Sequence, residues 1–80
     1  MEYDKDKVDE MVLALMRLGI CEDKYGVRTW KGFDWDAMDR LHEKGYISDP
    51  KSKARSVILS EKGIAKSQEL FEKYFGKKDG

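Results

Sequence analysis

The sequence predicts one α+β domain of three helices and a small antiparallel sheet. A segment with capping signals at both ends, Trp35 to Lys44, predicts the middle helix, and apolar residues at helical spacing predict a helix near each end of the chain. Two short segments rich in β-branched and apolar residues follow the middle helix. Eighty residues suffice for one domain with a small core. We expect it to cover residues 1–76, followed by a flexible tail at 77–80.

The first helix begins at Asp4 or Asp6, since either carboxylate can cap it, and ends at Gly19. Its apolar residues follow helical spacing and form a wide stripe: Val8, Met11, Val12, Leu13, Leu15, Met16 and Leu18. A stripe this wide predicts a helix buried on more than one side.

Residues 20–32 carry weaker signals. Glu22 to Gly26 is typical of a turn, and Val27 to Trp30 alternates like a short strand. The segment is either an added strand or an ordered loop, and it has no convincing helical period.

The middle helix has a signal at each end. Asp34 can accept from free N–H groups of the first turn, and Phe33 and Met38 are placed to form a hydrophobic staple. Gly45 ends the helix in a left-handed conformation, which places Tyr46 against Leu41. We expect Leu41 to be the central core residue, packed on Leu15, Leu59 and Phe71.

Two strands and a third helix follow. Residues 46–48 and 55–59 are the predicted strands, and the polar residues 51–54 between them are termed the wing. Ser60 caps the last helix, Glu61 to Phe75. Gly63 in its first turn costs ~1 kcal/mol relative to alanine, which a close neighbour would explain. The apolar stripe of this helix predicts docking on the first helix.

The chain resembles two known groups. Leu41, Gly45 and Ile47, then Leu59, Ser60, Glu61 and Gly63, match the second half of a winged helix-turn-helix domain. The segments V-D-E-M-V-L-A-L, W-K-G-F-D-W-D-A-M-D-R-L-H-E-K-G-Y-I and S-V-I-L-S-E-K-G resemble a family of small bacterial proteins defined by a domain of unknown function. The first resemblance implies a winged-helix-like fold, and the second implies no activity or ligand.

Composition narrows the function classes. Charged residues are 40% of the chain, but sixteen basic residues balance sixteen acidic ones, which removes the simplest argument for a nucleic-acid or membrane-surface partner. The acidic, polar start is not a signal peptide, and no apolar run approaches the ~18 residues of a membrane span. The single cysteine fits a reducing compartment, so we expect a cytoplasmic protein.

No motif predicts catalysis. His42 and Cys21 are the only soft metal ligands and lie in separate elements, whereas a structural zinc site needs four ligands. We therefore predict no catalytic residue, no metal and no cofactor, and a non-enzymatic protein.

Two functional hypotheses remain. Asp36, Asp39, Arg40 and Glu43 lie opposite the core face of the middle helix, where Arg40 can pair with Asp36 and Glu43. This acidic face repels DNA and, together with Trp30 and Trp35, suits a basic protein partner. The alternative is weak DNA binding, in which the wing region contacts phosphates through Lys51, Lys53 and Arg55.

Two further questions are open at this stage. Lys24, Arg28 and Lys31 would extend the wing cations into one ridge if residues 20–32 pack beside the wing, although such charges also protect a sheet edge from aggregation. Tyr25, Trp30, Phe33 and Trp35 are either core residues or a binding patch. The chain is expected to be a monomer or a weak homodimer.

Overall fold

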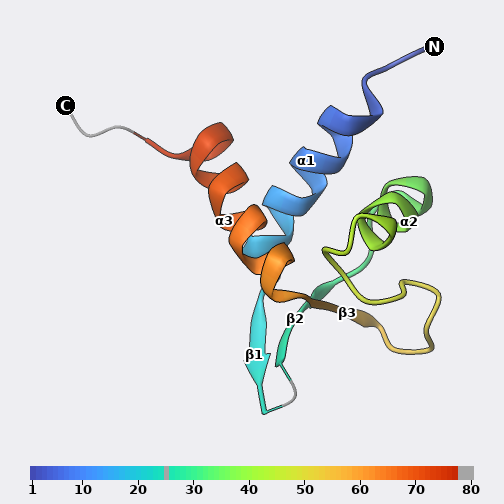
Figure 1. Cartoon of the computed structure of the whole chain (residues 1–80), viewed down its shortest axis with the longest axis vertical. Coiled ribbons are helices and arrows are strands. Elements are labelled where there is room, and N and C mark those ends of the chain that lie inside the picture. The colour runs from blue at the N-terminus through green and yellow to red at the C-terminus, as the bar shows by residue number, and fades with distance from the viewer. Residues whose placement is uncertain (25, 78–80) are drawn as a thin grey trace.

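The computed structural model describes residues 1–24 and 26–77. The elements in chain order are α1 (Lys5–Met16), η1 (Arg17–Gly19), β1 (Cys21–Asp23), β2 (Gly26–Trp30), α2 (Trp35–Glu43), β3 (Ser56–Leu59) and α3 (Glu61–Phe75). α1 lies between α2 and α3, and the strands lie beyond its C-terminal end (Figure 1). The predicted α+β class, with three helices and a small antiparallel sheet, is confirmed. The predictions for Tyr25 and for tail residues 78–80 lie outside the described residues.

The sheet joins the uncertain segment to the second half of the chain. Its order is β1-β2-β3 and both pairings are antiparallel, with Cys21 opposite Arg28 and Val27 opposite Leu59. The segment therefore supplies two of the three strands, β1 and β2. The strand predicted at 46–48 is wrong in extent, because only Ile47 forms a bridge, to Leu59. The Asp49-Pro50 turn follows directly, and proline has no N–H with which to continue a ladder.

The boundaries of α2 follow its local signals. Asp34 Oδ2 accepts from the backbone N–H of Ala37 at 3.2 Å, as expected of an N-cap. Gly45 has φ 82°. The N–H of Gly45 donates to the carbonyl of His42 at 3.0 Å and that of Tyr46 to the carbonyl of Leu41 at 3.1 Å. These two bonds form a Schellman motif, so the predicted end of the helix is confirmed.

The core lies where α1, α2, α3 and the sheet meet. Its buried apolar residues are Val12, Leu13, Ala14, Met16, Ala37, Met38, Leu41, Ile47, Val57, Leu59 and Leu70. The prediction that Leu41 is buried is confirmed, at 1% exposure. Of the neighbours expected around it, Leu59 lies in the same core and Phe71 packs against that core. Leu15 lies outside the core at 38% exposure, contrary to the expectation, and Leu18 is 73% exposed. Leu15 and Leu18 lie on a side of α1 and η1 that other elements cover only in part.

One serine joins α2, β3 and α3. Ser60 Oγ accepts from the N–H of Gly63 at 3.0 Å and donates to the carbonyl of Gly45 at 2.6 Å. The N–H of Ser60 also donates to the carbonyl of Tyr46 at 3.0 Å. These bonds hold the first turn of α3 on the end of α2. A Cβ atom at Gly63 would lie 2.0 Å from the carbonyl oxygen of Tyr46, which explains the glycine.

Replacing Gly63 with alanine should therefore destabilise the protein, although alanine is the better helix former. We expect a loss of ~1–3 kcal/mol in chemical denaturation, because the backbone of Tyr46 must move. Ala65→Gly in the same helix is the control, since Ala65 is exposed and its replacement costs only the ~1 kcal/mol propensity difference. A Gly63→Ala variant more stable than the wild type would contradict the close approach.

α3 docks on α1, as its apolar stripe predicted. Arg17 Nη1 donates to the carbonyl of Ile64 at 3.3 Å and to Ser67 Oγ at 3.1 Å. At the other end of the helix pair, the hydroxyl of Tyr74 donates to the carboxylate of Glu10. None of the helices in the described part of the chain has the length and apolar character required to cross a membrane.

Candidate functional site

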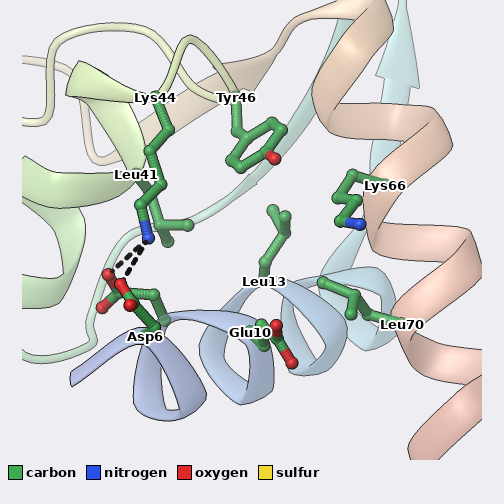
Figure 2. A pocket seen from close by; sticks show the side chains of 9 residues that line it. Asp6, Glu10, Leu13, Leu41, Lys44, Tyr46, Lys66 and Leu70 are labelled. Atoms are coloured by element: carbon green, nitrogen blue, oxygen red, sulfur yellow. Dashed lines mark hydrogen bonds and ion pairs between the residues drawn. The ribbon is translucent and has the colours of Figure 1, made fainter. Parts of the chain in front are cut away.

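A cleft of about 330 Å³ lies between α1, α2 and α3. Leu13, Leu41 and Leu70, one from each helix, point into it, and Tyr46 closes one side (Figure 2). Charged side chains of both signs surround these leucines: Asp6, Asp9, Glu10, Lys44 and Lys66. The cleft therefore has an apolar floor and a polar rim.

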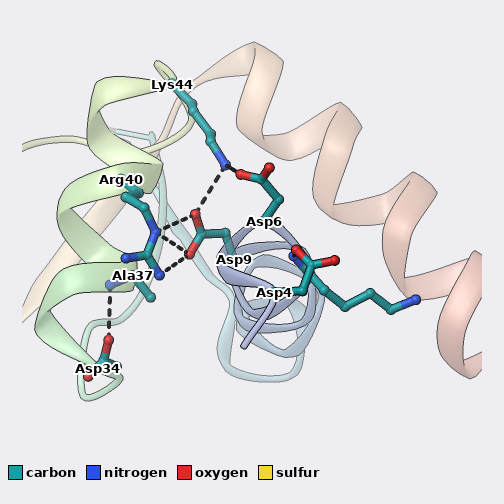
Figure 3. A network of polar contacts seen from close by, with 8 residues as sticks. Asp4, Asp6, Asp9, Asp34, Ala37, Arg40 and Lys44 are labelled. Atoms are coloured by element: carbon teal, nitrogen blue, oxygen red, sulfur yellow. Dashed lines mark hydrogen bonds and ion pairs between the residues drawn. The ribbon is translucent and has the colours of Figure 1, made fainter. Parts of the chain in front are cut away.

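The buried charge at this cleft is Asp9 of α1, whose side chain is 1% exposed. Arg40 of α2 binds it with a fork of two nitrogens: Nε lies 2.8 Å from Oδ2 and Nη2 lies 2.8 Å from Oδ1. Lys44, one turn further along α2, donates to Oδ2 at 3.1 Å and to Asp6 at 3.4 Å. Figure 3 shows both cations reaching from α2 to α1. We term Asp6, Asp9, Arg40 and Lys44 the inter-helix network.

This network controls the protonation of its members. Burial alone would raise the pKa of Asp9, but hydrogen bonds from Arg40 and Lys44 outweigh burial and hold that pKa below its ordinary value of 3.8. The hydrogen bond to Asp9 raises the pKa of Arg40. Burial opposes the charge of Lys44, yet its bonds to Asp9 and Asp6 raise the pKa of this amine. All three groups are therefore charged at neutral pH.

The lowered pKa of Asp9 predicts a loss of stability in acid. Because the pKa is lower in the folded state, the stabilisation is complete above the unfolded value and is lost as the pH falls through the folded value. We expect the difference in free energy of unfolding between wild type and Asp9→Asn to shrink as the pH falls through 3.8 and below. Glu72→Gln, which removes the charge of a carboxylate at an exposed position, is the matched control. A constant difference for Asp9→Asn would contradict the assignment.

The network corrects one prediction for α2. Arg40 was expected on the outer face in ion pairs with Asp36 and Glu43, but its guanidinium turns inward onto Asp9. A buried carboxylate binds a guanidinium more strongly than an exposed one does, because water screens the exposed pair. Asp36 and Glu43 remain exposed and Asp39 is half-buried. The outer face of α2 is therefore more acidic than the sequence indicated.

The two tryptophans are both exposed but lie on different elements. Trp35, the first residue of α2, is 60% exposed. Trp30, at the end of β2, is 64% exposed, and its ring centroid lies 6.1 Å from that of Phe33. Trp30 also lines a hollow with Leu15 and Leu18. The structure therefore places Trp35 beside the acidic residues of α2 and Trp30 beside the open side of α1.

The wing region is exposed throughout, including Lys51, Lys53 and Arg55. β2 pairs with β3, so Arg28 and Arg55 line one hollow. Arg28 Nε also forms an ion pair with Asp23 at 3.3 Å. Lys31 Nζ donates to the carbonyls of Pro50 and Ser52 at 2.8 and 2.7 Å.

The predicted basic ridge is therefore only partly assembled. Arg28 and Lys31 do lie beside the wing, but the guanidinium of Arg28 pairs with Asp23. The amine of Lys31 binds the carbonyls of Pro50 and Ser52. Lys51, Lys53 and Arg55 are exposed, as is Lys24, the remaining residue of the predicted ridge.

His42 and Cys21, for which no metal-binding or catalytic role was predicted, lie in separate elements. His42 is exposed and its Nδ1 donates to the carbonyl of Ile47 at 2.9 Å. Cys21 is a free, exposed thiol. Within residues 1–24 and 26–77, no three or more His, Cys, Asp or Glu side chains are grouped so as to hold a metal ion.

Asp9 is the important site residue that sequence reasoning missed. A signal was present: Asp9 shares the buried side of α1 with Val12, Leu13 and Met16, where an unpaired carboxylate is costly. Two cations four residues apart, Arg40 and Lys44, occupy one side of α2 and could have been matched to it.

The fold and the cleft describe a small α+β domain in which charged side chains join α1 to α2. Residues 4–77 match the family model named Domain of unknown function (DUF6429), so the chain belongs to this family. It is similar to the "Uncharacterized protein y4hR" of Sinorhizobium fredii, with 47% identity over 75 residues that cover 94% of this chain and 97% of that protein. No solved structure matches the chain, and the winged-helix resemblance is not confirmed.

Proposed function

We propose that the chain is a non-enzymatic interaction module that binds a basic segment of a partner protein through the outer face of α2. One observation carries the proposal: Trp35 is 60% exposed beside carboxylates whose neighbouring cations, Arg40 and Lys44, are turned onto Asp9. An exposed tryptophan costs free energy in water and commonly supplies binding energy at interfaces.

Electrostatics support a basic partner. Asp36, Asp39 and Glu43 follow one side of α2, and the inter-helix network holds the two nearest cations away from them. Such a face attracts Lys- and Arg-rich segments and repels the DNA backbone. Arg40, the only residue of this helix with a donor fork suited to guanine, is engaged by Asp9.

Affinity capture from a cell lysate tests this proposal. The bait is the tagged chain, and the variants are Trp35→Ala and the double charge reversal Asp36→Lys/Glu43→Lys. The matched control is Glu69→Lys/Glu72→Lys, which reverses two exposed carboxylates on α3. We expect a captured protein that both α2 variants lose, that the control keeps and that high salt releases. Equal capture by all variants would refute the proposal.

The alternative function, weak DNA binding, is favoured by the three exposed cations of residues 51–55. Titration with a mixed-sequence duplex at low and physiological salt tests it. Binding through the wing region should fade with salt and be lost in Lys51→Ala/Lys53→Ala/Arg55→Ala. Amide shifts at Asp36, Asp39 and Arg40 that persist at physiological salt would instead favour DNA binding by α2 over the protein-partner proposal.

The cellular setting is part of the same proposal. Cys21, the single cysteine of the sequence, is a free and exposed thiol. Such a thiol is compatible with a reducing compartment, and we therefore place the module in the cytoplasm.

A further inference from the structure

α1 carries a second set of apolar residues, which other elements cover only in part. Its buried residues are Asp9, Val12, Leu13, Ala14 and Met16. A second row runs along the helix and into η1 at spacings of three, four and three residues: Val8, Met11, Leu15 and Leu18. This is the spacing of a coiled-coil seam. The second row explains why the sequence of this helix is apolar on more than one side.

The row continues onto the sheet. One hollow of about 370 Å³ is lined by Tyr3, Val8, Met11 and Leu15, and the next, of about 260 Å³, by Leu15, Leu18, Trp30 and Phe33. The two hollows share Leu15 and therefore form one surface. We term Val8, Met11, Leu15, Leu18, Trp30 and Phe33 the apolar stripe.

The exposed area of this surface is large for an 80-residue chain. Tyr3, Leu15, Leu18 and Trp30 are 51%, 38%, 73% and 64% exposed. Since side chains of this size present roughly 200 Å² each, these four together expose on the order of 450 Å². That area lies within the ~300–600 Å² of the largest apolar patch on a typical monomer, a patch that is often functional. It is also more than half of the ~800 Å² that each partner contributes to a standard interface, before the half-buried members and a polar rim are included.

The charges at the two ends of the stripe differ. Asp4 and Lys7 line the hollow at one end, and the Lys7 amine lies over the ring of Tyr74 on α3, 5.0 Å from its centroid. At the other end, Arg28 and Arg55 line the hollow that adjoins Trp30. Arg55 makes no hydrogen bond or ion pair with any residue that the structure describes. One end therefore carries the Asp4 carboxylate, whose Oδ1 also caps α1 by accepting from the Lys7 N–H at 3.0 Å, together with the Lys7 amine. The other end carries the guanidinium groups of Arg28 and Arg55 and no carboxylate among the residues that line its hollow.

We propose that the apolar stripe is covered by the apolar stripe of a second copy of this chain, with the two α1 helices antiparallel, in a symmetric homodimer. An α-helix with this spacing packs well on another helix with the same spacing. A two-fold axis brings the same surface of two copies together, so a second copy supplies that helix. The antiparallel arrangement places Arg55 of each copy near Asp4 of the other, whereas a parallel one would bring the arginines of both copies together. This surface is distinct from the acidic face of α2, so the inference does not depend on the proposed function.

Sedimentation equilibrium from about 1 to about 500 μM tests the dimer. We expect a monomer–dimer equilibrium with a micromolar dissociation constant. Leu18→Glu should raise that constant at least ~30-fold, because it buries one charge per copy in the stripe. Leu18 is exposed, so the monomer should stay folded by circular dichroism, and Trp30→Gln is a second, milder variant. Trp35→Ala is the control: it removes a similarly exposed tryptophan outside the stripe and should leave the dimer unchanged.

Each outcome decides the inference. A monomer at every concentration, or a dimer that Leu18→Glu and Trp30→Gln leave unchanged, overturns it. The orientation is tested by Arg55→Glu, which should weaken an antiparallel dimer, while a stronger or unchanged dimer overturns that arrangement. Because Trp35→Ala affects partner capture and Leu18→Glu affects dimerisation, failure of this inference is distinguishable from failure of the proposed function.

Discussion

Replacing Asp9 with alanine should lower the free energy of unfolding by about 3 kcal/mol, as measured by chemical denaturation. The side chain of Asp9 is 1% exposed, and its removal leaves Arg40, which is 22% exposed, without its partner. Removing one member of a buried ion pair typically costs 3–5 kcal/mol. We expect the lower end of that range because Lys44 is 38% exposed and can turn to water or to Asp6.

A double variant separates the uncompensated charge from lost packing. In Asp9→Leu/Arg40→Met the carboxylate and the guanidinium are both gone, and apolar side chains fill the space. This variant should be more stable than Asp9→Ala, because well-packed apolar replacements of a buried pair are often neutral. A double variant as unstable as the single one would show that the shape of the pair, rather than its charge, stabilises the contact between α1 and α2.

Leu41→Ala should cost a similar amount, ~2–5 kcal/mol, in the same assay. Leu41 is 1% exposed and lies in the buried core, so truncation removes packing that holds α2 on the rest of the domain. The matched control is Leu18→Ala, which truncates a leucine that is 73% exposed and should cost less than ~0.5 kcal/mol. Equal losses at the two positions would contradict the burial pattern.

Local signals predicted the middle of the chain well. The Asp34 cap, the Gly45 Schellman motif and the Ser60 cap each depend on residues within four or five positions, and each is present in the structure. The close approach expected at Gly63 is also present, at the carbonyl of Tyr46. These features follow from short-range geometry, which sequence spacing encodes directly.

Long-range pairings were not predictable in the same way. Asp9 and Arg40 are separated by 31 positions, so a helical wheel of α2 alone assigned Arg40 to the wrong partners. The side of α1 that faces the core could not be identified from the sequence either, because apolar residues occupy most of the circumference of this helix. Periodicity finds a face only where a polar side contrasts with it, and α1 lacks that contrast at Leu15 and Leu18.

The junction at Ser60 determines where the chain should tolerate a change in length. Ser60 ties the end of α2 to the start of α3 through Gly45 and Tyr46, so residues next to the two helices hold this junction together. Ile47 and Ser48 are in turn bound to β3. Residues 51–55 are therefore an exposed loop. Insertions there should add little loop-closure cost. We therefore expect the three helices of this chain to keep their arrangement when residues 51–55 are lengthened or shortened.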